Sequence, residues 1–320
     1  MRDYEGIRLS LFHMQNIIDI YLEGTLIGHQ NPIFAVSQTS DANVLYTAGN
    51  DKGVVIWDLE KMSFQKLLCK VGSSVYVLKA IPNSDLLAIG MRSGQLLVVD
   101  TVKQTLVANL KTEQGAIFAI DFIKAKQEMI AIGEEGFAYV WDLNNFDLLY
   151  RFKIADTTVR TIATSKDQQT LAFGDKKGKI HLFEASDYQK RLEKQIHSMP
   201  VTSLLFINNH LVSGGRDAQL YKLKTSDLEL VQQVTPHMFT VYGIDQGNDA
   251  ETFATVSRDK TLKIWREKDI SLIKNVSRDR GYDSHHLSIN GMFWNQDRIF
   301  TVSDDKTVKV WKLNLLEAEG

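Results

Sequence analysis

The stretch that decides the fold is residues 28–58, which read GHQNPIFAVSQTSDANVLYTAGNDKGVVIWD. Apolar and polar residues alternate through the run that starts at Ile33 and through the two runs that lead to Trp57, and Gly, Asp and Asn separate these runs. Alternation with a period of two places successive side chains on opposite faces of a strand. The pattern therefore predicts short, half-buried antiparallel strands joined by tight turns.

The same pattern occurs seven times along the chain. Apolar segments of the type IFAV begin at Ile33, Val75, Ile117, Val159, Val201, Val241 and Ile289, at spacings of 42, 42, 42, 42, 40 and 48 residues. A second series, in the position of the tryptophan that ends the first unit, runs through Trp57, Val99, Trp141, Phe183, Leu223, Trp265 and Trp311. A period of about 40 residues with four strands is that of a propeller blade. The sequence predicts an all-β, seven-bladed β-propeller with four antiparallel strands per blade.

The unit from Gly28-His29 to Trp57-Asp58 resembles a complete WD repeat, and the resemblance to the WD-repeat (WD40) β-propeller family covers nearly the whole chain from about Ile18 onward. In this family the outermost strand of a blade follows Trp-Asp. The last unit ends soon after Trp311, whereas residues 18–27 precede the first unit without inner strands of their own. We expect this N-terminal strand to complete the seventh blade, which closes the ring, removes exposed strand edges and favours a monomer.

The expected organisation is an N-terminal extension, residues 1–17, followed by a single propeller, residues 18–320. The expected blades cover residues 28–70, 71–112, 113–154, 155–196, 197–236, 237–284, and 285–314 together with 18–27.

Composition and charge are those of an ordinary soluble globular protein. Hydrophobic residues make up 44% of the 320 residues, charged residues make up 24%, and the formal net charge is -2. This charge gives no global field for nucleic acid, and no apolar run is long enough for a membrane helix. The single cysteine, Cys69, and the lack of a signal-peptide pattern at the N-terminus predict a cytoplasmic protein.

Three units contain a tryptophan together with a histidine, a hydroxyl and a carboxylate, and the last three groups resemble a nucleophilic triad. The sets are His29, Thr47, Asp51 and Trp57; His237, Thr255, Asp259 and Trp265; and His285, Thr301, Asp305 and Trp311. Three copies of one active site in one ring would be unusual. The family resemblance implies instead a structural hydrogen-bond chain from Trp through Thr and His to Asp within each blade, which gives the buried polar groups their partners.

The other four units depart from this pattern. Unit five has His197, Ser213 and Asp217 but Leu223 in place of the tryptophan. Units two to four open with Val71, Glu113 and Ala155 and place Ile89, Ala131 and Phe173 where the threonine would be. We expect units two to four to depend on apolar packing and to hold no triad-like set.

The sequence predicts neither a metal site nor a cofactor. His285 and His286 are adjacent, so a strand would point them to opposite faces, and no CxxC or HExxH spacing occurs. Residues 174–179, GDKKGK, have glycines too closely spaced for a phosphate-binding P-loop and lack a following Ser or Thr. We interpret them as a hairpin turn.

The candidate binding surface is the rim called the top in the family that the chain resembles, where the loops before the innermost strands and the turns with the Asp residues lie together. The residue after the first apolar position of each inner strand is expected at the channel mouth; this series is Phe34, Tyr76, Phe118, Arg160, Thr202, Tyr242 and Asn290. Residues just before the Asp position form a second series, Asn50, Arg92, Glu134, Lys176, Arg216, Arg258 and Asp304. Aromatic residues and arginines are typical of interface hot spots. The alternative is that the aromatics fill the channel and the charges are solvated.

The function predicted from these features is a non-catalytic scaffold that binds a protein or peptide at the channel mouth and top rim. The basic residues on units four to six would suit an acidic or phosphorylated partner. The alternative is a propeller that binds a small molecule, or acts as an enzyme, through its central channel. The net charge disfavours nucleic acid as a partner.

Overall fold

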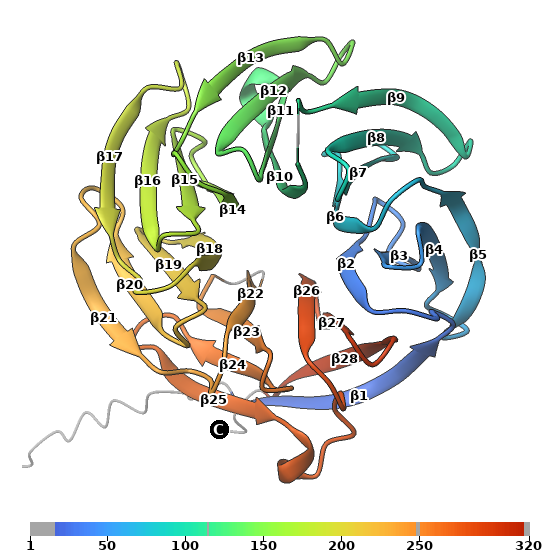
Figure 1. Cartoon of the computed structure of the whole chain (residues 1–320). Coiled ribbons are helices and arrows are strands. Elements are labelled where there is room, and N and C mark those ends of the chain that lie inside the picture. Colours follow the sequence, from blue (N-terminus) through green and yellow to red (C-terminus); the bar gives the residue numbers. More distant parts are fainter. Residues whose placement is uncertain (1–16, 114, 248–249, 317–320) are drawn as a thin grey trace, which may run out of the picture.

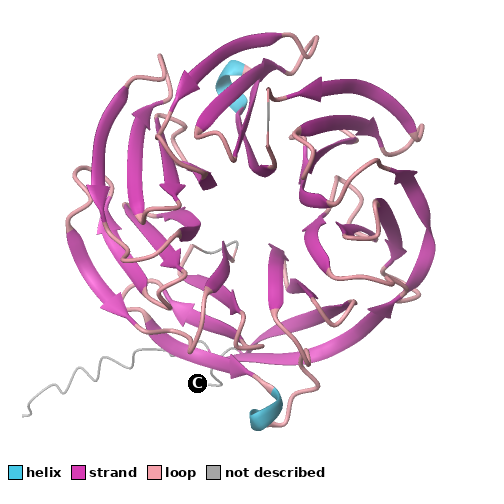
Figure 2. Ribbon diagram, in the orientation of Figure 1, coloured by secondary structure: helices cyan, strands magenta, loops and turns pink. Residues whose placement is uncertain are grey.

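The structure, a computed structural model, describes residues 17–113, 115–247 and 250–316. Within these ranges, seven four-stranded antiparallel sheets stand around a central axis as the blades of a ring (Figure 1). Strands and their turns make up nearly all of it, and the two helices are single turns, η1 (Lys124–Lys126) and η2 (Arg278–Arg280) (Figure 2). The predicted seven-bladed β-propeller is confirmed. The first 16 residues of the expected extension lie outside the described residues.

Each blade contributes one strand to each of four concentric layers. The innermost strands, which surround the channel, are β2 (Ile33–Ser37), β6 (Val75–Ala80), β10 (Ile117–Ile123), β14 (Val159–Thr164), β18 (Val201–Ile207), β22 (Val241–Gln246) and β26 (Ile289–Asn295). The second strands are β3 (Val44–Gly49), β7 (Leu86–Met91), β11 (Glu128–Gly133), β15 (Thr170–Asp175), β19 (His210–Gly215), β23 (Thr252–Ser257) and β27 (Arg298–Ser303). The third strands are β4 (Gly53–Asp58), β8 (Gln95–Asp100), β12 (Phe137–Asp142), β16 (Lys179–Glu184), β20 (Leu220–Lys224), β24 (Leu262–Arg266) and β28 (Thr307–Leu316). The outermost strands are β5 (Ser63–Lys70), β9 (Thr105–Lys111), β13 (Leu148–Lys153), β17 (Lys190–Gln195), β21 (Leu230–Val234), β25 (Ser271–Val276) and β1 (Ile17–Ile27).

The ring closes through its N-terminal strand. β1 pairs antiparallel with β28 from Ile17↔Leu316 to Ile27↔Thr307, so the seventh sheet has the order β1-β28-β27-β26. Arg298 on β27 donates two hydrogen bonds of 2.7 Å to Glu23 on β1, a bidentate pair that reaches across the sheet. This confirms the predicted closure, and the pairing extends one residue before residue 18 and two residues past residue 314.

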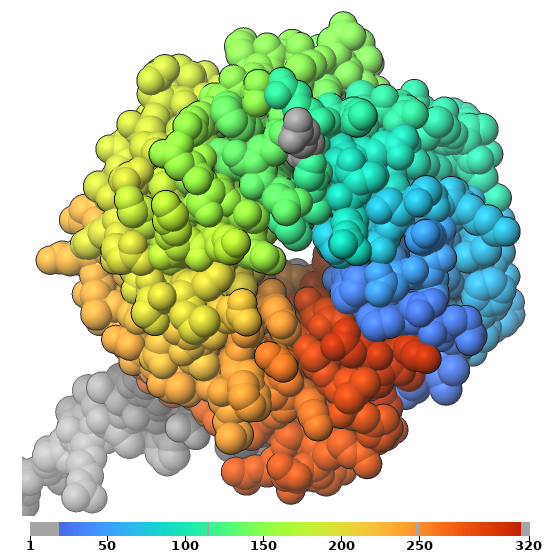
Figure 3. Space-filling model, in the orientation of Figure 1, coloured from blue at the N-terminus to red at the C-terminus, as the bar shows by residue number. Residues whose placement is uncertain are grey.

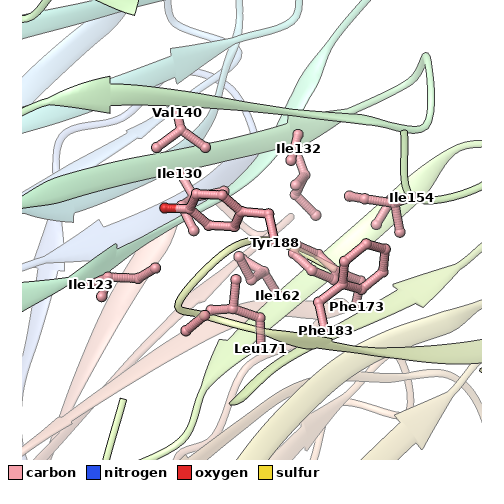
Figure 4. Close-up of a cluster of buried hydrophobic side chains, with 13 residues drawn as sticks. Ile123, Ile130, Ile132, Val140, Ile154, Ile162, Leu171, Phe173, Phe183 and Tyr188 are labelled. Carbon is pink, nitrogen blue, oxygen red and sulfur yellow. The ribbon is translucent and has the colours of Figure 1, made fainter. Parts of the chain in front are cut away.

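Apolar side chains from neighbouring blades interlock and hold the ring together. Figure 4 shows the cluster between blades three and four, where Phe173, Phe183 and Tyr188 meet isoleucines such as Ile130 from blade three. Phe173 is fully buried, and its ring contacts that of Phe183 edge-on at 5.3 Å. Burying one such side chain contributes roughly 1.5–3 kcal/mol. Blade four thus fills with aromatic rings the positions that hold Thr and Trp in blades one, six and seven.

Candidate functional site

The channel-mouth residues are placed by a repeated irregularity of the inner strands. In all seven blades the register between the first and second strands shifts after the first residue of the inner strand, for example between Ile33 and Ala35. The extra residue is the one predicted at the channel mouth, such as Phe34, Tyr76 or Phe118. A β-bulge turns its extra side chain away from the ladder. The first residue of each inner strand can therefore stay buried while the next one faces the channel.

The structure brings four of these residues into contact. The rings of Phe34 and Tyr76 lie 5.7 Å apart, those of Tyr76 and Phe118 stack at 5.6 Å, and the Arg160 guanidinium lies 4.9 Å from the Phe118 ring centre. They form an arc across blades one to four at a channel of about 620 Å³, whose opening is visible at the centre of Figure 3. Tyr242 lines the same channel and is 37% exposed.

Asn290 does not project as a free contact. Its amide donates to the Ile33 carbonyl at 3.0 Å and to Asp304 at 2.8 Å, which ties blade seven to blade one. The Thr202 hydroxyl likewise donates to the Val241 carbonyl of the next blade. These two members of the predicted series therefore join neighbouring inner strands.

The lower part of the channel carries polar side chains that bond one another. The Thr164 hydroxyl donates to Asp121 at 2.8 Å, and the Lys79 ammonium lies 3.6 Å from the same carboxylate. Asp245 accepts the Trp294 N–H at 2.8 Å, and burial raises the pKa of Asp245 to about 6. Asp245 lies on the channel wall, and the predicted rim series did not include it.

The histidine sets form buried hydrogen-bond networks, called histidine networks below. In blade one the Trp57 indole N–H donates to the Thr47 hydroxyl at 2.7 Å, and that hydroxyl lies 2.8 Å from His29 Nε2. The Asp51 carboxylate can only accept, so His29 Nδ1 carries the proton of the neutral imidazole and donates to Asp51 at 2.6 Å. Nε2 is then the acceptor, and the Thr47 hydroxyl donates to it. The chain predicted from Trp through Thr and His to Asp is present.

Blades five, six and seven repeat this arrangement. In blade six, His237 lies 2.7 Å from the Thr255 hydroxyl and 3.0 Å from Asp259, and Trp265 donates to Thr255 at 2.9 Å. In blade seven, His285 lies 2.9 Å from both the Thr301 hydroxyl and Asp305, and Trp311 donates to Thr301 at 3.0 Å. In blade five, His197 contacts Ser213 at 2.6 Å and Asp217 at 2.9 Å, and the Tyr221 ring lies edge-on to it at 4.7 Å where no tryptophan is present.

The histidine networks are buried, which gives them a structural and not a catalytic role. The four histidine side chains are 0% exposed, and the hydroxyl-bearing residues are fully buried as well, so a substrate cannot reach them. Burial lowers the pKa of His237, and the hydrogen bond to Asp259 only partly opposes this. Burial alone would raise the pKa of Asp259, but the hydrogen bond and the charge of His237 outweigh it and hold that pKa well below its usual range.

Each network also fixes the loop that leads into its blade. The carboxylate accepts the backbone N–H of the residue that follows the histidine; the pairs are Gln30 with Asp51 at 3.1 Å, and Ser198 with Asp217, Met238 with Asp259 and His286 with Asp305 at 3.0 Å each. The networks therefore set the conformation of four loops on the top rim.

These loops expose apolar residues in blades five to seven. Met199, Phe239 and Leu287 occupy the second position after the histidine and are 41%, 52% and 48% exposed, while Met238 is 82% exposed. Blade one has Gln30 and Asn31 in this loop instead. Sequence reasoning missed these residues because loop positions have no periodicity, although the contrast with the polar loop of blade one was a usable signal.

The predicted basic residues of the turns lie at the surface. They are Arg92, Lys176, Arg216 and Arg258, all of them exposed. The Arg258 guanidinium lies 5.9 Å from the Phe239 ring centre, so the basic and apolar features of blade six adjoin one another. We call Met199, Met238, Phe239, Leu287, Arg216 and Arg258 together the top-rim patch.

Blade four contains a buried histidine–carboxylate pair that the sequence analysis did not predict. His181 Nε2 lies 2.9 Å from Asp175, and both side chains are 2% exposed. No hydroxyl completes this pair, but it is a buried histidine–carboxylate pair. In blade three, the Tyr139 hydroxyl donates to Glu135 at 2.7 Å and accepts the Glu113 N–H at 3.2 Å. Both pairs were missed because His181 and Tyr139 lie two residues before the tryptophan position.

In the part of the chain that the structure describes, no helix is long and apolar enough to cross a membrane. Across the same residues, no group of three or more His, Cys, Asp or Glu side chains is placed to hold a metal ion. The turn at residues 174–179 links β15 to β16 as a hairpin, with Gly178 at φ 87°, as its glycine spacing predicted.

Comparisons with known proteins agree with this geometry. The family model for the WD40 repeat, described as WD domain, G-beta repeat, matches residues 21–58, 228–266 and 278–312. These segments include the tryptophans of the three blades with complete networks. Relatives include Actin-interacting protein 1 of Drosophila melanogaster, 24% identical over 84% of this chain and 45% of the relative. WD repeat-containing protein 1 of Xenopus tropicalis is 23% identical over 81% of this chain and 44% of the relative. Target of rapamycin complex subunit LST8 of Mus musculus is 24% identical over 74% of this chain and 77% of the relative.

This chain thus spans less than half the length of the first and second of these relatives. The sequence resemblance, the ring of seven blades, the histidine networks and the matching segments lead to one conclusion. The chain is a seven-bladed β-propeller, and three of its segments match the WD40 repeat.

Proposed function

We propose that this propeller is a non-catalytic platform that binds a protein partner on the top-rim patch of blades five to seven. One observation carries the proposal. Met238 and Phe239 are exposed side by side in sequence on a loop whose backbone is fixed by the buried Asp259–His237 network. An exposed apolar pair on a fixed loop loses little conformational entropy when a partner covers it.

The composition of the patch supports a protein partner. Met, aromatic residues and Arg are enriched at protein interfaces, and contiguous exposed apolar surface usually marks an interaction site. Arg216 and Arg258 flank the apolar residues with positive charge, and the Lys176 turn of blade four continues it. We propose an acidic partner surface, because complementary charge around an apolar contact speeds association and adds specificity.

The names of two relatives support binding as the activity. One is an actin-interacting protein, and the other is a subunit of a target of rapamycin complex. The absence of catalysis is part of the proposal, and the burial of every His–hydroxyl set described above supports it. We also propose a cytosolic location, for which the single cysteine gives support.

A second candidate is the capture of a short peptide side chain or small ligand in the channel. The observation that favours it is the arc of Phe34, Tyr76 and Phe118 above Asp245, whose raised pKa marks an unusual carboxyl. A substitution of Asp245 by Asn would then weaken ligand binding in the channel and leave capture by the top-rim patch intact.

The test compares matched surface variants in quantitative co-purification from native lysate, followed by titration of the purified partner. We expect Phe239→Ala combined with Met238→Ser to weaken binding at least about tenfold, since a truncated anchor residue commonly loses 2 kcal/mol or more. Leu148→Ser on the outer strand β13, where Leu148 is 53% exposed, is the control and should bind like wild type. Equal binding by wild type and the double variant, at unchanged melting temperature, would reject the top-rim patch as the binding surface.

A further inference from the structure

A second concave site lies on the side of blade four, apart from the channel. A cavity of about 270 Å³ is enclosed by the end of β13, residues 154–157 that lead into blade four, the β15–β16 turn and the facing strands β16 and β17. Its charged lining includes Lys153, Lys177, Lys179, Lys190, His181 and Glu193. Pockets for drug-sized molecules have roughly 300–1,000 Å³, so this volume suits one small chemical group.

In blades three, six and seven a side chain of the third strand reaches across the corresponding space. The residue two positions before the tryptophan position reaches the loop that leads into its blade in three cases. The Tyr139 hydroxyl accepts the Glu113 N–H at 3.2 Å, Lys263 donates to the Pro236 carbonyl at 2.6 Å, and Lys309 donates to Asp283 at 2.9 Å. His181 occupies this position in blade four, but the cavity separates it from residues 154–157.

His181 therefore keeps one unused polar atom in the cavity wall. Its Nε2 is bonded to Asp175, whereas Nδ1 is buried and has no hydrogen-bond partner within the described residues. Glu193 Oε2 lies 3.3 Å from Nδ1, but the pair lacks hydrogen-bond alignment. A buried polar atom without a partner is costly, roughly 1–3 kcal/mol, and a ligand that bonds to it recovers that free energy.

The charges around this atom favour an anion. Four lysines face three carboxylates, those of Asp156, Asp175 and Glu193. Lys179 and Lys190 donate to Glu193 at 2.8 and 3.0 Å, and these bonds lower the pKa of Glu193 to about 2. Glu193 thus stays ionised and holds both ammonium groups at the wall. The Lys177 ammonium has no carboxylate partner among the described residues, and Lys153 pairs only with the exposed Asp156.

We propose that this cavity binds a phosphate group displayed on a peptide or protein, with the ammonium groups of Lys177, Lys153 and Lys190 donating to its oxygens. Because His181 Nε2–H donates to Asp175, Nδ1 of the neutral ring is an acceptor, and the P–OH of a monoanionic phosphate donates to it. Phosphate oxygens are strong acceptors that can bond several donors at once. Lys153 is 55% exposed, so the cavity is open to the rim and a side chain can enter. This site is separate from the top-rim patch, and its failure would leave the proposed function of that patch standing.

The experiment titrates the full-length protein with inorganic phosphate, with a phosphoserine peptide and with the same peptide carrying serine, by isothermal calorimetry. We expect the phosphopeptide to bind more tightly than phosphate, and the serine peptide not to bind. Lys177→Glu should lose at least about tenfold in phosphopeptide affinity, because a charge-assisted hydrogen bond is replaced by repulsion. The control is Lys194→Glu, since Lys194 on β17 donates to the Leu228 carbonyl and does not line the cavity.

A second readout keeps the proposal testable independently of affinity. The ring-nitrogen resonances of His181, assigned by comparison with His181→Gln, should shift when the phosphopeptide is added. Phosphopeptide binding that leaves the His181 signal unchanged, or that is equal in wild type and Lys177→Glu, would place the phosphate elsewhere and overturn the proposal. If inorganic phosphate binds but the phosphopeptide does not, the proposal is also overturned, because the site would then hold only a free ion.

Discussion

Blades four and six show two ways to stabilise the same four-stranded sheet. Blade six places a buried polar network, His237, Thr255 and Asp259, between its strands and closes it with Trp265. Blade four uses Phe173 and Phe183 in the Thr and Trp positions and packs them against blade three.

The difference lies in what happens at the top rim. The polar network fixes the N–H of Met238 and so holds an exposed loop in place. The packing of Phe173 and Phe183 offers no directional bond to the loop that leads into blade four, and a lysine-lined cavity lies there instead. A buried hydrogen-bond network requires every partner to be present, whereas packing requires only volume.

The largest effect is expected from Phe173→Ala in blade four. Phe173 is fully buried, and removing its ring leaves a cavity between blades three and four, so the free energy of unfolding should fall by about 3–5 kcal/mol. Denaturant unfolding measures this, and Phe173→Leu, which keeps most of the volume, should recover most of the loss. A loss below about 1 kcal/mol would mean that this cluster is not what stabilises blade four.

A smaller loss is expected from Asp259→Ala in blade six. The substitution leaves His237 Nδ1 and the Met238 N–H without their acceptor, at a cost of about 1–3 kcal/mol. Glu135→Ala in blade three is the matched comparison. Glu135 is only half-buried and serves the Tyr139 hydroxyl in place of a histidine, so its loss should be clearly smaller. Equal unfolding midpoints for the two variants would contradict the larger structural role assigned to the network of blade six.

The buried network of blade six should also make stability depend on pH. The pKa of His237 in the folded protein lies below its ordinary value of about 6.5, so the unfolded chain binds a proton there first, and stability falls as the pH drops below about 6.5. The pKa of Asp259 is also depressed, so its contribution is present above about pH 4 and is lost as the pH falls through its folded value. His237→Gln should flatten the decline in melting temperature between pH 7 and 5, whereas Phe173→Leu should keep the wild-type slope. An unchanged slope in His237→Gln would contradict this assignment.

The smallest effect on stability is expected at the exposed loop itself. Phe239→Ala should change the free energy of unfolding by no more than about 0.5 kcal/mol, because a surface side chain outside any network contributes little. Thermal melting of this variant beside Asp259→Ala checks it. A loss as large as that of Asp259→Ala would show that Phe239 belongs to the core of blade six.

The repeat made most of the fold predictable. The alternating runs that start at Ile33 and recur through Ile289 specify strand pairing, because each apolar set can be buried in only one register. The closing strand followed from counting strands, and the four histidine networks followed from the family pattern. Each of these features recurs along the chain and so leaves a periodic signal.

The features that sequence reasoning missed have no such signal. Phe239 is an apolar residue in a loop, and only the comparison with the polar loop of blade one, Gln30 and Asn31, could have indicated its exposure. The bond of Asn290 across the boundary between blades seven and one was not predicted, because it depends on the distance between two inner strands. His181 was overlooked because its possible role depends on the cavity beside it, and only the packing of blades three and four defines that cavity.

The central claim is that the histidine networks hold the exposed loops of the top rim in place, and amide hydrogen exchange at Met238 tests it most directly. Met238 is 82% exposed, yet its N–H donates to Asp259 at 3.0 Å. We predict that this amide is protected in the wild-type protein and exchanges at the rate of an open loop in Asp259→Ala, while amides of residues 154–157 in blade four keep their wild-type rates. Equal exchange of the Met238 amide in wild type and Asp259→Ala would contradict the claim.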